Sequence, residues 1–187
     1  VNSIGSALLG GQPLDSALSR LEQESGLGLI VLENDLSRRT LAPQMQSALA
    51  NVEQLVVIDH RNSELLANAD FVFPAASFAE GDGTVVSAEG RAQRFYQVFA
   101  PEYYDESVVI KESWRWLDAL GQVISHRRFN WRSLDQITSA CAMTIDSLKP
   151  IVQAAPNARF RIKGMKIARS PHRYSGRTAM LADLDEH

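Results

Sequence analysis

The sequence predicts an α/β fold: a doubly wound, mostly parallel sheet fragment with helices on both faces. Three apolar runs of strand length, LGLIVLEND, QLVVIDH and DFVFPA, alternate with helical patterns and are joined by short links. Continuous apolar runs suit strands that are covered on both faces, as in a parallel sheet. Alternation of strand and helix is typical of doubly wound units. We also expect an irregular hairpin and an extended basic C-terminal tail.

Helical periodicity supports the elements between and after these strands. Apolar residues recur at helical spacing in six segments, where we expect helices at 14–25, 43–52, 63–68, about 106–125, 133–144 and 146–154. Asn62 or Ser63 is the expected cap of the short third helix. In the fourth helix, the apolar stripe that contains Trp114 and Leu117 is expected to be buried.

The stretch SFAEGDGTVVSAEGRAQRF, residues 77–95, combines turn-forming glycines with acidic residues and arginines. The segments TVVS and AQRFYQVF within and after it predict the hairpin. Glycines let backbone N–H groups approach an anion, and Arg91 could bind a phosphate through two hydrogen bonds. Alternatively, Gly81 and Gly83 only supply positive φ angles, while Glu80 or Glu89 pairs with Arg91 or Arg94. Spacing favours this structural interpretation, because the pattern is neither GxGxxG nor a P-loop.

Polar residues at the carboxyl ends of predicted strands are candidates for a ligand site, because α/β sheets bind ligands there. His60 follows the second strand, beside Asp59. Neighbouring strand residues point to opposite faces, so an Asp59–His60 relay has poor geometry and a loop histidine is the preferred interpretation. Asn34 and Asp35 follow the first strand, where capping and turn formation explain them.

The cysteine and histidine content argues against a metal site. Cys141 is the one cysteine, and it lies in an apolar helical pattern typical of a buried, inert thiol. An iron–sulfur cluster normally takes four protein ligands. His126, His172 and His187 are scattered, without ligands at metal-site spacing. We expect no catalytic, cofactor-binding or metal-binding residue in this chain.

Composition is that of an ordinary globular protein of 187 residues, with a net charge of −3 that gives no global attraction to nucleic acid. No apolar run reaches the roughly 18 residues of a membrane span, and no signal peptide opens the chain, so we expect a reducing, cytoplasmic setting. Because the first residue is Val1, we expect a piece of a longer protein.

The last part of the sequence differs in character, which divides the chain into residues 1–155 and a basic tail at 156–187. Seven basic residues occur there with no acid among them: Arg159, Arg161, Lys163, Lys166, Arg169, Arg173 and Arg177. The tail lacks a recognisable RNA-binding module. We expect it to lie on an acidic surface of the parent chain or of a partner, or to be solvated.

The stretch ADFVFPAASFAEGDGTVVSAEGRAQRF, residues 69–95, strongly resembles a motif of the molybdopterin oxidoreductase superfamily. In that superfamily a strand is followed by LPAA, an acidic residue, DGT and an NxEGRxQ-like segment. The segment KESWRWLDALG resembles the family's tryptophan-bearing helix. Within the superfamily, the segments VLENDLSRR, VVIDHRNSELLANAD, GRAQRFYQVFAPEYYD and RIKGMKIARSPHRYSGRTAM are most similar to the large iron–sulfur subunits of bacterial NADH:quinone oxidoreductase, respiratory complex I. This resemblance runs from about Gly26 to Met180.

The resemblance implies an oxidoreductase of the electron transport chain, a translocase, whose 4Fe-4S and 2Fe-2S clusters are held by cysteines in an N-terminal region outside this chain. The molybdopterin-like part of those large iron–sulfur subunits is a relic domain without the cofactor. Ser87 stands where molybdoenzymes usually carry Asn, which agrees with that loss. Glu89, Arg91 and Gln93 would then pin the hairpin to the sheet, with Arg91 facing a carboxylate or backbone carbonyls.

Three functions therefore compete. The first is a non-catalytic structural part of the NADH:quinone oxidoreductase peripheral arm, in contact with other subunits on the cytoplasmic side of the inner membrane, without membrane insertion or nucleic acid. The second is a piece of an active molybdopterin-dependent enzyme such as a formate dehydrogenase, which would bind a pterin nucleotide. The third is an RNA-binding or interaction module that uses the basic tail and would show steep salt dependence.

Overall fold

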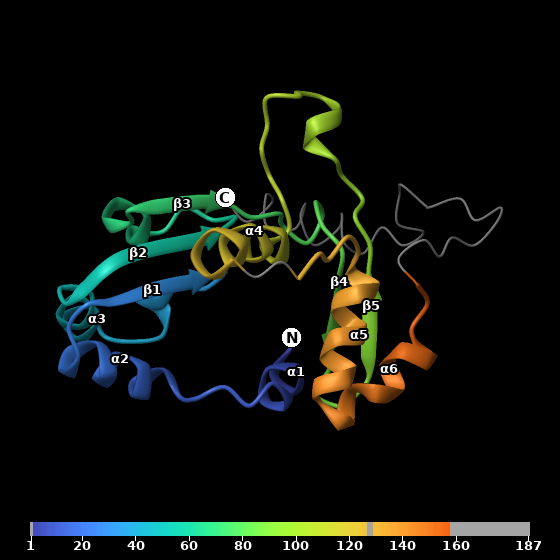
Figure 1. Cartoon of the computed structure of the whole chain (residues 1–187), viewed down its shortest axis with the longest axis horizontal. Coiled ribbons are helices and arrows are strands. Elements are labelled where there is room, and N and C mark those ends of the chain that lie inside the picture. The colour runs from blue at the N-terminus through green and yellow to red at the C-terminus, as the bar shows by residue number, and fades with distance from the viewer. Residues whose placement is uncertain (1, 127–128, 158–187) are drawn as a thin grey trace, which may run out of the picture.

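The computed structural model describes residues 2–126 and 129–157, so the predicted basic tail lies outside the described residues from 158 onward. The described chain forms a three-stranded parallel sheet and a separate two-stranded antiparallel hairpin (Figure 1). Helices accompany both. The α/β fold expected from the sequence is confirmed.

The parallel sheet has the order β1-β2-β3, with β1 at Leu27–Leu32, β2 at Val52–Asp59 and β3 at Phe71–Pro74. The register places Leu32, Ile58 and Phe73 side by side across the three strands. Because neighbours in register point to the same side, this row lies on one face of the sheet and the preceding row on the other.

Helices α2 (Leu14–Gln23) and α3 (Ala42–Leu49) and the 3-10 helix η2 (Glu64–Asn68) cover the face that carries Val31 and Val57. The apolar core beneath them consists of Val31, Leu36, Met45, Leu55, Val57 and Leu65. Leu18 and Leu21 of α2 pack with Ala48 of α3 in an adjoining cluster, as their helical spacing predicts.

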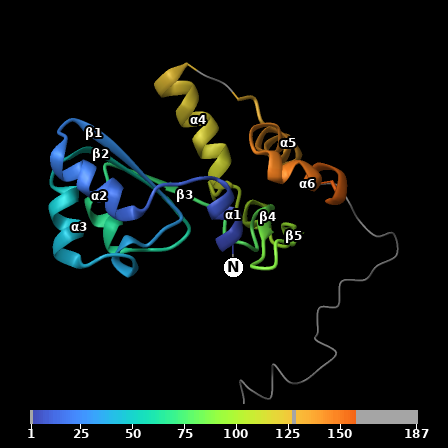
Figure 2. The same ribbon diagram turned by 90° about the horizontal axis from the view of Figure 1, so that it is seen from below.

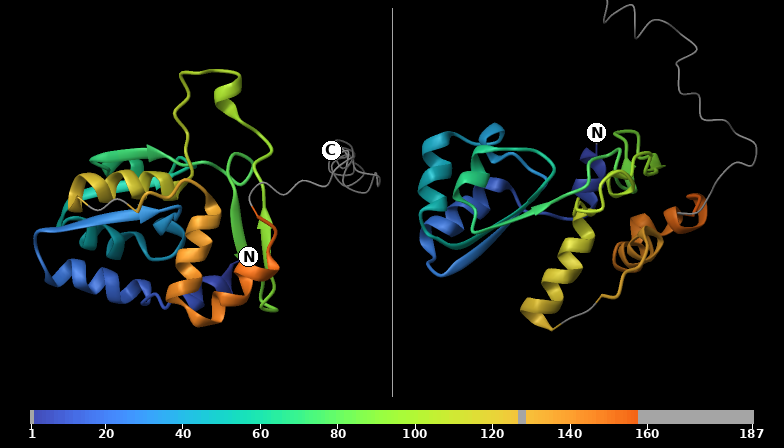
Figure 3. Two further views of the ribbon diagram at one scale, coloured as in Figure 1. Left: turned by 45° about the vertical axis from the view of Figure 1, so that its right-hand side comes forward. Right: turned by 90° about the horizontal axis from the view of Figure 1, so that it is seen from above.

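Helix α4 (Ser113–Ser125) lies on the opposite side of the sheet from α3 (Figure 3). The Trp116 ring lies 5.0 Å from that of Phe73, and its indole N–H donates to the Pro74 carbonyl at 2.8 Å. Ile58 is completely buried on this face. Helix α4 covers the face only in part, because Ile30 remains 44% exposed.

The hairpin strands β4 (Gly83–Val86) and β5 (Ala92–Phe95) pair in antiparallel register, as predicted, but end earlier than the sequence pattern indicated. Helix α1 (Ser3–Leu8), which the sequence did not predict, packs beside them (Figure 2). The Val86 N–H donates to Asn2 Oδ1 at 2.8 Å. This contact holds the N-terminal part of the described chain on the hairpin.

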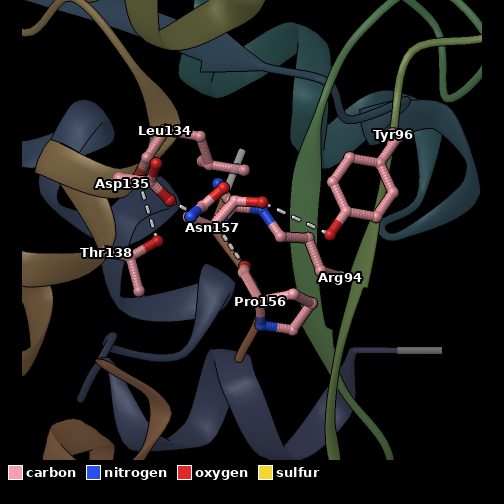
Figure 4. A network of polar contacts seen from close by, with 7 residues as sticks. All are labelled: Arg94, Tyr96, Leu134, Asp135, Thr138, Pro156 and Asn157. Carbon is pink, nitrogen blue, oxygen red and sulfur yellow. Dashed lines mark hydrogen bonds and ion pairs between the residues drawn. The ribbon is translucent and has the colours of Figure 1, made fainter. Parts of the chain in front are cut away.

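Helices α5 (Leu134–Thr144) and α6 (Lys149–Ala154) are joined to the hairpin through Arg94 (Figure 4). The Arg94 side chain is only 3% exposed, and Nη1 lies 2.5 Å from Asp135 Oδ1 and 3.0 Å from the Pro156 carbonyl oxygen. Its Nε and Nη2 atoms are buried without a hydrogen-bond partner among the described residues. The Asp135 contact therefore carries most of the compensation for a buried charge.

The predicted helix at about 106–125 is wrong in its first turns, since α4 begins at Ser113. Lys111 instead forms a parallel bridge with Ala75, which continues the sheet and holds the backbone extended before the helix. Trp114 and Leu117 are half-buried rather than buried. The capping position of η2 is Ser63, as expected, although its hydroxyl makes no capping hydrogen bond.

Three further single-turn 3-10 helices complete the described chain: η1 (Leu36–Arg38), η3 (Pro101–Tyr103) and η4 (Asp146–Leu148). Within residues 2–126 and 129–157, we find no helix with the length and apolar character needed to cross a bilayer.

Replacing Ile58 by Ala should lower the free energy of unfolding by about 2–5 kcal/mol, because the side chain is fully buried between the sheet and α4. Ile30→Ala is the matched control on the same face, where we expect a loss of about 1 kcal/mol or less. Chemical denaturation measures both values. Equal losses would contradict the assigned packing.

Asp135→Ala should cost about 3 kcal/mol, because it leaves the buried Arg94 guanidinium without its carboxylate. Asp135 is itself 40% exposed, so we place the effect at the low end for buried pairs. Glu24→Ala removes the exposed Arg20–Glu24 pair and should cost about 1 kcal/mol or less. Similar urea midpoints for these two variants would rule out a buried ion pair at Arg94.

Candidate functional site

A small cleft of about 120 Å³ lies where the parallel strands end and α4 begins. We call it the strand-end cleft. Its polar lining residues are Glu33, His60, Ser77, Asp82, Glu112 and Ser113. This is the edge of an α/β sheet at which ligands usually bind. The structure thus brings His60 and the start of the 77–95 stretch together, as candidates from separate parts of the sequence.

Glu33 occupies the side of the cleft nearest β1, and the sequence analysis missed it. Its backbone has a φ of +45°, and its N–H donates to the Ile58 carbonyl at 2.8 Å. The carboxylate accepts a hydrogen bond from the Ser113 hydroxyl at the first residue of α4. Because helix N-termini attract anions, Glu33 occupies a place that a bound anion would otherwise favour.

His60 and Asp59 follow each other at the end of β2. Asp59 is 8% exposed, and its Oδ1 accepts from the Arg61 N–H at 3.0 Å. His60 Nδ1 lies 3.4 Å from the same oxygen. The expectation that the two side chains diverge is therefore wrong, because the strand ends at Asp59 and the chain turns. The carboxylate nevertheless has its short hydrogen bond to backbone rather than to the imidazole.

Asn34 and Asp35, the other strand-end candidates, are not among the residues that line the strand-end cleft. Asp35 caps η1, where its Oδ1 accepts from the Ser37 hydroxyl at 2.6 Å and from the Ser37 N–H at 3.2 Å. These hydrogen bonds hold the pKa of Asp35 below its ordinary value. The capping interpretation is confirmed for Asp35.

Two of the three acidic residues of the 77–95 stretch accept hydrogen bonds from nearby backbone. Glu80 accepts from the Ser77 N–H at 2.9 Å, and Asp82 accepts from the Gln97 N–H at 2.6 Å. Hydrogen bonds from the Ser77 hydroxyl and N–H lower the pKa of Glu80. Ser87 Oγ accepts from two N–H groups in the β4–β5 turn, each at 3.3 Å. These contacts shape the loop and the hairpin.

Arg91 departs from the sequence-based expectation. Its side chain is exposed and makes no hydrogen bond or ion pair with the described residues. Glu89 and Gln93 are exposed as well, so these three residues do not pin the hairpin to the sheet. Arg94 provides the buried anchor instead, and it joins the hairpin to α5.

The glycines of the stretch also differ from expectation in their roles. Gly90 has the positive φ, +76°, at the hairpin turn. At Gly83 an added Cβ atom would overlap the Phe95 ring, which packs directly over the glycine across the hairpin. Gly81 is buried beside Glu112. These positions serve packing and turn geometry.

Metal-ligating side chains do not gather in the part of the chain that the structure describes, where no three His, Cys, Asp or Glu residues form a group suited to a metal ion. Cys141 is half-buried on α5, against an expectation of full burial. His126 follows α4 in a left-handed conformation. His172 and His187 lie outside the described residues.

Comparison with known proteins agrees with the sequence resemblance. Residues 11–122 match the family model of molybdopterin oxidoreductase. The chain is 50% identical to the NADH-quinone oxidoreductase G subunit of Shewanella oneidensis over 97% of its length and 20% of the relative. Identity is 51% with the same protein of Pseudomonas putida and 48% with that of Salmonella typhimurium, in each case over 100% of this chain and 21% of the relative.

The chain therefore spans about a fifth of the length of these curated relatives. The family match covers β1 to β3, the hairpin and nearly all of α4, and so includes every residue that lines the strand-end cleft. From these matches we conclude that the chain belongs to the molybdopterin oxidoreductase family and is homologous to the G subunit of NADH-quinone oxidoreductase.

Proposed function

We propose that this chain is a non-catalytic structural part of an iron–sulfur subunit in the peripheral arm of NADH:quinone oxidoreductase, where it supports electron transfer from NADH to quinone. The observation that carries the proposal is the strand-end cleft, which the chain lines with its own acidic side chains. The cleft lies at the edge of the sheet where α/β folds usually bind ligands, but its lining does not suit a pterin nucleotide.

A pterin nucleotide carries phosphate groups, which need cations or clustered N–H donors. Three carboxylates, those of Glu33, Asp82 and Glu112, line the cleft, and none of the described residues brings a Lys or Arg to it. Among the same residues, His60 is the one basic side chain in the lining. The volume of about 120 Å³ is also well below the roughly 300–1,000 Å³ of typical small-molecule pockets. The residues of the cleft therefore do not fit the cofactor.

The polar groups around the cleft instead hold the structure together. Ser113, 8% exposed, joins the start of α4 to Glu33 after β1. Asp82 fixes the backbone at Gln97, where the chain leaves the hairpin. The Glu112 carboxylate pairs with Arg115 one turn further along α4. Each carboxylate is satisfied by a group of the same chain, so the site functions as a joint between the sheet, α4 and the hairpin.

The clusters and partners follow from the same proposal. Homology to the NADH-quinone oxidoreductase relatives supports 4Fe-4S and 2Fe-2S clusters in the parent chain, held by cysteines outside this segment, with other peripheral-arm subunits as partners. The parent would lie on the cytoplasmic side of the bacterial inner membrane. A boundary near residue 155, before the basic tail, belongs to the proposal as well.

A structural role predicts that changes in the cleft alter assembly but not turnover. In the full-length subunit, we expect Glu33→Gln with His60→Ala to leave NADH:quinone turnover per assembled enzyme unchanged, because neither group meets a substrate or cofactor. Ile58→Ala, a core control, should lower the amount of assembled enzyme at unchanged turnover. Loss of turnover in fully assembled enzyme that carries the cleft substitutions would contradict the proposal.

An active molybdopterin enzyme is distinguished by ligand binding. We expect the thermal midpoint of the chain to be unchanged by the guanine-dinucleotide form of the pterin cofactor, and the purified chain to hold no stoichiometric iron, zinc or molybdenum. A ligand at 100 times its Kd would stabilise the protein by about 2.7 kcal/mol, which is readily detected. A saturable rise in the midpoint that Glu33→Lys strengthens would favour a cofactor site.

A further inference from the structure

The segment 97–110 projects from the rest of the chain as a long loop between the hairpin and α4, and we call it the aromatic loop (Figure 1). Its base is tied at both ends. The N–H groups of Val98 and Phe99 donate to the Ala79 carbonyl at 2.9 Å, and Lys111, directly after the loop, pairs with Ala75. A loop with fixed, neighbouring ends and packing of its own is often functional.

The aromatic loop is ordered internally by ring stacking and by capped turns. The Phe99 and Tyr104 rings stack at 5.5 Å, and Tyr103 meets Tyr104 edge-on at 5.3 Å. Asp105 Oδ1 accepts from the hydroxyl and the N–H of Ser107. Such contacts fix the backbone before any partner arrives, which lowers the entropic cost of binding.

The same aromatic side chains are left open to solvent. Tyr103 is 83% exposed and Tyr104 is 75% exposed, and Val98 and Val109 are exposed beside them. Tyrosine is enriched among the residues that dominate protein interfaces, since it gives a large contact area with little loss of side-chain freedom. The aromatic loop therefore presents a preformed contact surface.

The charges of the aromatic loop are all of one sign. Glu102, Asp105 and Glu106 are exposed, and residues 97–110 contain no Lys or Arg. A complementary partner would combine positive charge with apolar side chains, because guanidinium and ammonium groups are attracted both to carboxylates and to aromatic faces.

A groove of about 550 Å³ lies at the base of the aromatic loop, and Pro101, Glu102, Val108 and Val109 of the loop line it. Two cations, Lys111 and Arg115, also line it, but both have partners. Arg115 Nε lies 2.6 Å from Glu112, and Lys111 Nζ lies 4.8 Å from the Trp116 ring. Because Lys111 and Arg115 contact groups of their own, the Glu102 carboxylate in the groove can still attract a further cation.

One segment of this chain has the required chemistry. Residues 158–177 carry seven Lys or Arg residues and no acid, interspersed with apolar residues such as Phe160, Ile162 and Met165. Basic and acidic residues are unevenly distributed along the chain. Residues 158–187 contain seven basic and three acidic residues. Residues 1–157 contain 12 basic and 19 acidic residues, which gives this part a net charge of −7.

The last described residues, Pro156 and Asn157, contact the strand that leads into the aromatic loop. The Pro156 carbonyl accepts from Arg94, and the Asn157 carbonyl accepts from the Tyr96 hydroxyl at 3.5 Å (Figure 4). Tyr96 directly precedes the aromatic loop in sequence. A tether this short gives the basic segment a high effective concentration at the loop.

We propose that the basic segment, residues 158–177, binds the acidic, aromatic loop of its own chain, with its cations on Glu102, Asp105 and Glu106 and on the faces of Tyr103 and Tyr104. The aromatic loop and the basic segment would then form one surface, in which each covers the charge of the other.

Photo-crosslinking of the whole chain tests this contact. The photoreactive residue p-benzoylphenylalanine replaces Tyr103, and it replaces Val123, which is 76% exposed at the end of α4, as the matched control. After irradiation, peptide mass spectrometry locates the crosslinks. We expect the Tyr103 position to crosslink within the same chain to peptides from 158–177, with a yield several-fold above that of the Val123 position.

Two further conditions test the electrostatic part. Raising the salt concentration to about 1 M, where the screening length is about 3 Å, should reduce the crosslink yield of the otherwise unchanged probe. Glu102→Lys with Glu106→Lys should reduce it at low salt, while Glu22→Lys, an exposed change on α2, should not.

The outcomes separate the possible occupants of the aromatic loop. Intramolecular crosslinks to 158–177 that are lost at high salt support the proposal. Crosslinks between two copies of the chain, crosslinks to other regions, equal yields from both probe positions or the absence of any crosslink would each overturn it.

Discussion

The two-sided burial of strand β2 is the constraint on which the rest of the structure depends. Val57 and Ile58 are neighbours in sequence, point to opposite faces, and are 1% and 0% exposed. The first face is covered by α2 and α3, which precede β2, but the second is covered by α4, which arrives only after the hairpin and the aromatic loop. The hairpin and the aromatic loop therefore lie inside one long connection whose far end must return to the sheet. Their bases are fixed by that return, at the bridge between Ala75 and Lys111.

The strand-end cleft results from this geometry, and an acidic side chain of the protein lies at its helix N-terminus. Parallel strands direct their carboxyl ends to one edge, and the helix that covers the second face begins there, with its positive end toward the cleft. Glu33 meets that end from β1 and is hydrogen-bonded to Ser113. An acidic side chain of the protein thus satisfies the field that would favour a phosphate, and binding of an anion would have to displace it.

Features that arise from local sequence pattern were predicted correctly. Features that depend on contacts between distant parts of the chain were not. The three strands follow from continuous apolar runs, and the capping role of Asp35 from turn chemistry. Arg91 and Arg94 could not be distinguished, because the register of the hairpin determines which arginine faces α5. The start of α4 was misplaced because helical periodicity continues through the residues before Ser113, where Lys111 forms a bridge with Ala75 instead. Glu33 gave no signal of its own, since its role depends on a turn at positive φ and on a helix 80 residues away in sequence.

The hairpin also fastens the two ends of the described chain. Val86 on β4 holds Asn2, and Arg94 and Tyr96 on and just after β5 hold Pro156 and Asn157. Because β4 and β5 are adjacent, tension applied between residues 2 and 157 would act on one two-stranded ribbon. The side-chain contacts of that ribbon would give way first. The parallel sheet, which holds the core, would be spared until they had done so.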